Sequence, residues 1–264
     1  MKSVLDFTAA KAAGRKISMV TCYDAAFARV LEASKVDSLL VGDSAAMVVH
    51  GHADTLAATV EMMALHVAAV RRGAPTRFLV ADLPFLSFRK GIPAALDAVA
   101  ALMRAGAQAV KLEGVAGHED VITAIVGSGV PVMGHLGLTP QSVNAFSGYR
   151  VQGRSDGAAA RIVEDAKRLE ALGCFSIVLE CVPSALGARV TAAVGIPTIG
   201  IGAGAACDGQ VLVLQDLLGL SDARRPRFVR TYLDGAQVAR DAFDRFDADV
   251  KQGAFPAPAE TYES

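Results

Sequence analysis

The feature that most constrains the fold of this chain is a repeated alternation of short apolar runs with longer amphipathic segments of helical period. The apolar runs are nearly continuous in hydrophobic residues, which is typical of strands buried on both faces of a parallel sheet. We predict that each run forms a β-strand. The runs are Ile17–Cys22, Ser38–Gly42, Arg77–Ala81, Gln108–Leu112, Pro131–His135, Phe175–Leu179, Pro197–Ile201 and Gln210–Leu214.

Segments with a helical pattern separate these predicted strands, and Gly106, Gly173 and Gly195 stand where helices should end. Strands that alternate with helices pair in parallel through right-handed crossovers. An open doubly wound sheet shows the same alternation, but eight units within 264 residues favour closure into a (β/α)8 TIM barrel. The predicted helices are Asp24–Ser34, Thr55–Arg72, Ile92–Ala105, Gly117–Gly127, Ala158–Leu172 and Ser184–Val194.

We expect a single barrel domain over residues 1–264, because α/β barrels reach this length as one unit. A leading helix near Val4–Ala13 would cover the bottom of the barrel. Gln237–Lys251 would form the last helix, and the tail Pro256–Ser264 is expected to be loose.

Composition and charge argue against several classes of protein. The formal net charge of −1 disfavours a broad basic face for nucleic acid or for an anionic membrane. The apolar runs are well below the ~20 residues that span a bilayer, and the first residues lack the apolar core of a signal peptide. The four cysteines form no Cys-x-x-Cys pair. We therefore expect a cytoplasmic protein with reduced thiols and no nucleic-acid or membrane partner.

Carboxylates recur at the carboxyl ends of the predicted strands, at Asp43, Asp82, Glu113 and Glu180. In a barrel these ends converge on one mouth, where catalytic residues lie. A single acid after a strand most often caps a helix or starts a turn, but four at equivalent positions indicate a shared role. Converging carboxylates repel one another and need a cation or raised pKa values. An all-oxygen set without a nearby Cys or His favours Mg²⁺ over Zn²⁺.

Two further side chains belong to these strand ends. Lys111 shares a strand face with Glu113, so its ammonium group could hold a substrate carboxylate; an ion pair with a neighbouring acid explains it equally well. His135 ends the fifth predicted strand and could act as an acid, a base or a substrate donor. The alternative for His135 is a hydrogen-bonded structural histidine.

Two motifs allow a binding interpretation that the sequence does not decide. His50-Gly51-His52 has a weak metal-ligand spacing, and a loop role is the stronger interpretation. Gly200–Gly204 follows the seventh predicted strand, where barrels often bind anions, but it lacks the spacing of phosphate loops. A tight turn or a close backbone approach explains the glycines equally well.

Several longer runs of residues form a recognisable set. They are Thr21–Asp24, Leu40–Ser44, Ala81–Phe85, Val110–Gly114, Gly134–Ser142, Val178–Pro183 and Ile199–Gly204. On these runs the chain, from about residue 3 to about residue 255, resembles the ketopantoate hydroxymethyltransferase family. The resemblance implies a barrel of the phosphoenolpyruvate mutase and isocitrate lyase type that assembles as a homodecamer.

The resemblance also assigns roles to residues. It implies a Mg²⁺ site formed by Asp43, Asp82 and Glu113, with Glu180 as the catalytic base. It further implies a small 2-oxo acid substrate, 3-methyl-2-oxobutanoate, and a reduced-folate co-substrate, 5,10-methylenetetrahydrofolate. The product would be 2-dehydropantoate, an intermediate of pantothenate and coenzyme A biosynthesis.

The same resemblance implies how the oxo acid is held. Ser44 and Lys111 would join Asp43 and Asp82 as substrate-binding residues. His135 would contact the new hydroxymethyl group.

Three positions depart from the family pattern. Val115 and Ser147 stand where glycine is usual, and His50 stands where glutamine is usual. These departures concern loop geometry, because none of the three is a predicted ligand.

Two rival interpretations use different chemistry. One is a Mg²⁺-dependent lyase or decarboxylase of the same barrel type, but the Lys-Lys-Cys-Gly-His lid loop of such lyases is absent from this sequence. The other is a non-catalytic barrel that binds a metabolite, which would not need an acid at each of these strand ends.

Overall fold

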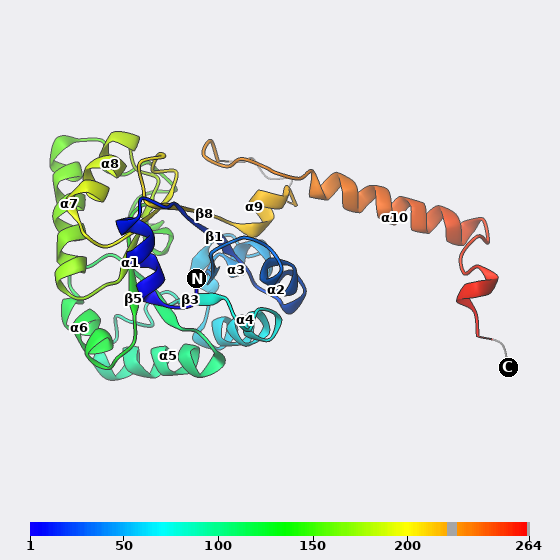
Figure 1. Cartoon of the computed structure of the whole chain (residues 1–264), viewed down its shortest axis with the longest axis horizontal. Helices are drawn as coiled ribbons and strands as arrows, with labels where there is room; N and C mark the ends of the chain where they lie inside the picture. The colour runs from blue at the N-terminus through cyan, green and yellow to red at the C-terminus, as the bar shows by residue number, and fades with distance from the viewer. Residues whose placement is uncertain (221–225, 263–264) are drawn as a thin grey trace. The chain divides into compact units, whose positions relative to one another are not determined.

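The computed structural model describes residues 1–220 and 226–262, and its contacts divide the chain into two compact units, Met1–Val213 and Leu214–Ser264. In the first unit, eight parallel strands form a closed barrel in sequential order, β1 to β8, and helices surround it (Figure 1). The predicted TIM barrel is therefore confirmed. The strands are β1 (Ile17–Thr21), β2 (Ser38–Val41), β3 (Phe78–Asp82), β4 (Ala109–Glu113), β5 (Val132–Gly137), β6 (Ser176–Glu180), β7 (Thr198–Ile201) and β8 (Gly209–Leu212).

Helices connect the consecutive strands from β1 to β7, as is usual for parallel pairing, whereas residues 202–208 join β7 to β8 without a helix. They are α2 (Ala25–Glu32), α3 (Ala45–Val48), α4 (Val60–Gly73), α5 (Ile92–Ala105), α6 (Glu119–Gly127), α7 (Asp156–Ala171) and α8 (Ser184–Ala193), with 3-10 turns η1 (Thr55–Ala57) and η2 (Pro140–Ser142). Glycine ends two of them as predicted: Gly106 adopts a left-handed φ of 116° at the end of α5, and Gly173 adopts a φ of 90° just after the C-cap of α7.

Strand register places the polar side chains of the mouth side by side. Asp82 at the end of β3 pairs with Lys111 on β4, and Glu113 at the end of β4 pairs with His135 on β5. Residues that were separate in sequence therefore become neighbours across the barrel wall.

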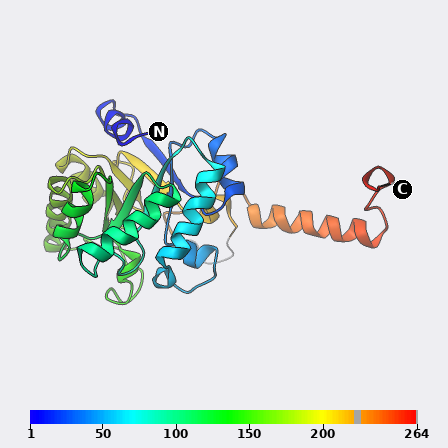
Figure 2. The same cartoon turned by 90° about the horizontal axis from the view of Figure 1, so that it is seen from below.

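The opposite end of the barrel is closed by α1 (Val4–Ala12), which lies beside the N-terminus in Figure 2. Phe7 and Ala10 of this helix pack into a cluster of inward-facing strand residues that includes Met19 and Phe78. Apolar burial is thus the main attachment of α1 to the barrel. The predicted N-terminal helix is confirmed.

Lys11 adds a polar anchor to this helix. Its ammonium nitrogen donates to the backbone oxygens of Thr191, Val194 and Ile196 at 3.0–3.1 Å and lies 3.0 Å from the Asp208 carboxylate. These carbonyls belong to the last turn of α8 and the segment after it, where a helix leaves carbonyl groups without partners.

We expect Lys11→Met to lower the free energy of unfolding by about 2–3 kcal/mol, because hydrogen bonds to a charged donor are lost while their acceptors stay partly buried. Urea denaturation measures the change. The matched control is Lys2→Met beside the same helix, which should change stability by less than ~0.5 kcal/mol. Equal losses in both variants would contradict the anchoring role of Lys11.

The start of one helix was predicted wrongly. Thr55–Arg72 was expected to be continuous, but it divides into η1 and α4 because two separate caps compete for the chain. The Asp54 side chain accepts from the Leu56 backbone and starts η1, and the Thr59 side chain accepts from the Met62 backbone and starts α4. Ala58 between them is extended.

Other boundaries also needed correction. His135 does not end the fifth strand, because β5 continues to Gly137. Leu214 begins the short helix α9 instead of ending the eighth strand. The short helix α3, which follows Asp43 and Ser44, was not expected from the sequence.

Ser147, where we expected glycine from the family resemblance, has a backbone conformation that favours glycine. Its φ is 54°, in the left-handed region where a Cβ atom is strained and glycine is not. Val115, the other position where glycine is usual, is buried and has no left-handed φ. Of these two positions, only Ser147 therefore carries a conformational cost.

Ser147→Gly should raise the free energy of unfolding by about 0.5–1 kcal/mol, because relief of the strained Cβ outweighs the added freedom of the unfolded chain. Urea denaturation is again the measurement. Ser128→Gly is the matched control: Ser128 has an ordinary φ of −82°, so the same substitution should destabilise the protein there. A loss of stability in Ser147→Gly would be the contrary result.

The second unit contains α9 (Leu214–Leu218), α10 (Gly235–Lys251) and the 3-10 turn η3 (Pro258–Glu260). The predicted last helix is confirmed by α10, in which only Gly235 is buried. The predicted loose tail contains η3, whereas Glu263 and Ser264 lie outside the described residues. A single domain over the whole chain stays a prediction.

The structure describes the state of the cysteines and the character of the helices. All four cysteines are free, with Cys22, Cys174 and Cys207 buried. Among the described residues, no helix combines the length and apolarity needed to cross a bilayer.

Candidate active site

The four predicted carboxylates lie at the carboxyl ends of four strands of the barrel. Asp43 follows β2, and Asp82, Glu113 and Glu180 are the last residues of β3, β4 and β6. The side chains of Asp82 and Glu113 are each 4% exposed, whereas that of Glu180 is 17% exposed. Asp43 is buried as well. Glu180 is therefore the carboxylate of this group that solvent and a ligand reach most readily.

Burial and mutual repulsion raise the pKa of Asp43 well above its usual range, with Asp82 and Glu113 as the repelling charges. The convergence predicted from the strand ends thus has a direct electrostatic consequence.

Lys111 forms an ion pair inside this group. Its Nζ lies 2.9 Å from Asp82 Oδ1, and both side chains are buried. Burial alone would lower the pKa of Lys111, but the attraction of Asp82, Glu113 and Asp43 outweighs it and raises that pKa. The ion-pair alternative for Lys111 therefore holds in this structure, and a second function of the same ammonium group toward a substrate remains a prediction.

His135 lies between two acids. Its Nδ1 is 3.6 Å from Glu113 Oε1 and 3.3 Å from Lys111 Nζ, and its Nε2 is 3.3 Å from Glu180 Oε2. Burial and the charge of Lys111 lower the pKa of His135, but the contacts with Glu113 and Glu180 outweigh them and raise it to about 9. The ring is therefore cationic at neutral pH and bridges the Glu113 and Glu180 sides of the mouth.

Gln141 is a site residue that sequence reasoning missed. Its Nε2 donates to Asp43 Oδ2 at 2.8 Å and to the Leu83 backbone oxygen at 2.9 Å, and its backbone N donates to Glu113 Oε2 at 3.0 Å. It therefore fixes two carboxylates from different strands. The only sequence signal was its place in the family run Gly134–Ser142, because neither residue type nor spacing indicates such a contact.

Ser44 is held by a second residue without a predicted role. Its Oγ lies 2.9 Å from the hydroxyl of Tyr23, which is fully buried. Glycine at position 42 leaves room for this arrangement, since a Cβ there would lie 2.8 Å from Ser44 Oγ. The backbone N of Asp43 donates to Asp82 Oδ2, which ties the same turn to β3.

The donor chemistry of this site fits a divalent cation. Four carboxylates face two basic side chains, Lys111 and His135, so the acids outnumber the bases beside them. Glu113 Oε1 is buried and accepts no hydrogen bond within the described residues. An acceptor left unpaired in this way is costly unless a cation approaches it. Asp43, Asp82 and Glu113 would supply oxygen ligands, which Mg²⁺ prefers.

The carboxylate side chains do not converge on a single point where a metal ion could bind. Within residues 1–220 and 226–262, no three His, Cys, Asp or Glu side chains are grouped closely enough to hold a metal ion. The ligand set Asp43, Asp82 and Glu113 therefore stays a prediction.

The structure shows contacts for both undecided motifs. His50 Nε2 is 2.8 Å from His66 Nε2, so His50 pairs with α4 and not with His52. In the Gly200–Gly204 loop, the Ala203 oxygen would lie 2.2 Å from a Cβ at Gly187. This loop thus packs against α8, which supports the close-approach explanation.

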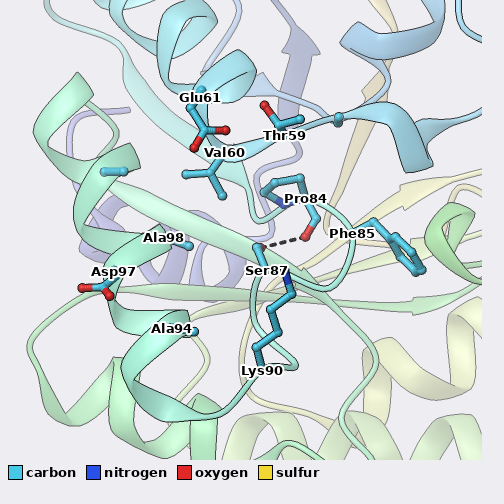
Figure 3. A pocket seen from close by; sticks show the side chains of 12 residues that line it. Thr59, Val60, Glu61, Pro84, Phe85, Ser87, Lys90, Ala94, Asp97 and Ala98 are labelled. Atoms are coloured by element: carbon cyan, nitrogen blue, oxygen red, sulfur yellow. Dashed lines mark hydrogen bonds between the residues drawn. The ribbon is translucent and has the colours of Figure 1, made fainter.

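A separate pocket of about 510 Å³ lies between α4 and α5 (Figure 3). Glu61, Pro84, Lys90 and Asp97 are among its lining residues. No predicted site residue lines it, so it is distinct from the carboxylate group.

Comparison with known proteins identifies the family. The model of the family described as ketopantoate hydroxymethyltransferase matches residues 2–258. The chain belongs to the ketopantoate hydroxymethyltransferase family. The chain is 54% identical to the 3-methyl-2-oxobutanoate hydroxymethyltransferase of Bdellovibrio bacteriovorus, over 99% of this chain and 100% of that protein. Proteins of the same name from Coxiella burnetii and Francisella tularensis subsp. tularensis are 52% and 48% identical, with at least 95% of each chain covered.

Ketopantoate hydroxymethyltransferases are transferases, so family membership disfavours the non-catalytic barrel. Solved structures confirm the barrel type. A 2,3-dimethylmalate lyase of the PEP mutase/isocitrate lyase superfamily aligns with a TM-score of 0.62 at 17% identity, covering 94% of this chain and 87% of that one. A phosphonopyruvate hydrolase complex with oxalate and Mg²⁺ aligns with a TM-score of 0.64 at 12% identity, covering 98% and 93%. At such identities the likeness concerns the fold alone.

Proposed function

We propose that this chain transfers a hydroxymethyl group from 5,10-methylenetetrahydrofolate, with water supplying the hydroxyl, to C3 of 3-methyl-2-oxobutanoate, giving tetrahydrofolate and 2-dehydropantoate for pantothenate and coenzyme A biosynthesis. The observation that carries the proposal is one mouth in which strand-end acids of β2, β3, β4 and β6 surround a buried lysine and a cationic histidine. Full-length identity with proteins named for this reaction supports the choice of substrate.

In this proposal Asp43, Asp82 and Glu113 hold Mg²⁺. When bound, the ion withdraws electron density from the keto group of the oxo acid and so favours loss of the C3 proton. Gln141 orients the metal-facing carboxylates, because it donates to Asp43 and Glu113 at once.

Glu180 would remove the C3 proton. It is the most exposed of the four acids, and it stands on the other side of His135 from Glu113. A base must lie within reach of the proton it removes, and an accessible carboxylate beside the metal-binding acids meets that requirement. The cationic ring of His135 orients Glu180 and would also contact the new hydroxymethyl group.

Lys111 and Ser44 would bind the oxo acid with Asp43 and Asp82. The Lys111 ammonium group can exchange part of its contact with Asp82 for the negative charge of the substrate. The Ser44 hydroxyl is kept in place by Tyr23 and can donate to a substrate oxygen.

Proton NMR in D₂O tests the whole proposal. With enzyme and Mg²⁺, the C3 proton signal of 3-methyl-2-oxobutanoate should disappear, and EDTA should stop the loss. Addition of methylenetetrahydrofolate should produce a hydroxymethyl signal. If neither exchange nor product appears, the proposal fails, and cleavage of other oxo acids by a lyase mechanism becomes the next hypothesis.

We also propose a cytoplasmic homodecamer. The exposed apolar side chains of α10, Val238, Phe243, Phe246 and Val250, support association, since subunit contacts would remove them from water. Sedimentation velocity measures the assembly, and a monomer at micromolar concentration would contradict it.

A further inference from the structure

The loop of residues 138–155, between β5 and α7, extends across the barrel mouth. Gln141 near its start reaches Asp43 after β2, and η2 in this loop packs against η1 of the β2–α4 connection. Further along, the Tyr149 hydroxyl donates to Met47 Sδ of α3 at 3.7 Å. The loop therefore covers the metal-binding acids and places Tyr149 on the β2 side of the mouth.

Tyr149 combines an exposed ring with a position close to the acids. Half of the residue is exposed to solvent. Partial burial raises the pKa of its hydroxyl, and the charges of Asp54, Asp43, Glu180 and Glu113 raise it further. A half-exposed aromatic ring offers a flat apolar face to a ligand that stacks.

Asp54, whose charge acts on the Tyr149 hydroxyl, adds a hydrogen-bond acceptor. Its Oδ1 accepts from the Leu56 backbone, and within the described residues no hydrogen bond reaches its other oxygen. The backbone contact with Leu56 keeps the carboxylate in place at the start of η1.

We propose that Tyr149 and Asp54 form the subsite for the pterin ring of the reduced folate. The flat aminopyrimidinone part would stack on the Tyr149 ring, and its N–H groups would donate to Asp54. The inference rests on the proposed function, because it names where the second substrate of that reaction binds.

The negative charge near Tyr149 favours the neutral pterin end of the folate over its anionic glutamyl end. Four acidic side chains act electrostatically on the Tyr149 hydroxyl, so an anionic ligand there would be repelled, whereas a neutral heterocycle with several N–H donors is favoured. The glutamyl tail of the folate would consequently point away from Asp43, Glu113 and Glu180. Because Glu180 acts on Tyr149 electrostatically, a pterin stacked there also lies near the acid that would remove the C3 proton.

Steady-state kinetics with methylenetetrahydrofolate as the varied substrate test the subsite. Tyr149→Ala should raise the KM for the folate roughly tenfold or more, the usual loss when an aromatic stacking partner is removed. Tyr149→Phe keeps the ring and should stay within about twofold of wild type. Asp54→Asn keeps a good helix-capping side chain but removes the charge, and should raise the same KM several-fold.

The folate-free exchange of the C3 proton separates this inference from the proposed function. If the subsite is correct, Tyr149→Ala loses folate affinity while its exchange rate and its KM for the oxo acid stay close to wild type. An unchanged folate KM, or an equal loss of exchange, would overturn the subsite and leave the proposed reaction standing. Absence of exchange in the wild-type enzyme would overturn both. Circular dichroism of each variant excludes unfolding as the cause.

Discussion

Glu180→Gln should reduce C3 proton exchange by about 10²–10⁴-fold, the usual contribution of a general base. Glutamine has nearly the same shape and can still accept from His135 Nε2, which lies 3.3 Å from Glu180 Oε2. The substitution therefore removes the proton acceptor with little change in packing. The exchange rate is followed by proton NMR in D₂O with saturating Mg²⁺ and 3-methyl-2-oxobutanoate.

The exchange result is informative only if the Glu180→Gln variant still binds the oxo acid. Isothermal titration of the oxo acid in the presence of Mg²⁺ should give a dissociation constant within a few-fold of wild type. The matched control is Glu164→Gln on α7, an exposed acid paired with Lys167, which should exchange normally. Exchange at the wild-type rate by Glu180→Gln would remove Glu180 from the role of base.

Asp82→Asn should abolish the effect of Mg²⁺ on stability. If Asp82 is a ligand, saturating Mg²⁺ at about a hundred times its dissociation constant stabilises the wild-type protein by about 2.7 kcal/mol. For a domain of this size the melting temperature would rise by about 5–10 °C. The variant loses one negative oxygen ligand, and Lys111 loses its paired charge and competes with the ion for the remaining acids.

The melting temperature is measured by differential scanning fluorimetry with EDTA or Mg²⁺, and Mn²⁺ binding is followed by electron paramagnetic resonance. Glu180→Gln is the matched control, because Glu180 is not a proposed ligand and its Mg²⁺ response should persist. If Asp82→Asn kept the full response to Mg²⁺, the proposed ligand set would be falsified.

The barrel was predictable from sequence because its signals are local. Strands buried on both faces need nearly continuous apolar residues, and glycine residues such as Gly106 mark helix ends. Parallel pairing then brings every strand end to one mouth. From that rule alone we predicted that four acids would lie together at the mouth: Asp43, Asp82, Glu113 and Glu180.

Boundaries were less predictable where two local signals competed. The single helix expected over Thr55–Arg72 failed because Asp54 and Thr59 each cap a separate turn. His135 lies two residues before the end of β5, which continues to Gly137. Propensity cannot rank such alternatives, since their energies differ by about 1 kcal/mol or less.

The sequence by itself determined the fold class, the strand-end acids and the family, because apolar period, residue type and long matching runs do not depend on tertiary contacts. Only the tertiary structure decided the partners of those residues. Strand register paired Lys111 with Asp82, and the crossing of the mouth by one loop brought Gln141 to Asp43 and Tyr149 to the acids. The raised pKa of His135 follows from its contacts with Glu113 and Glu180, which outweigh the opposing effect of burial. Such contacts join residues far apart in the chain, and their energies depend on distance and burial, which no sequence spacing specifies.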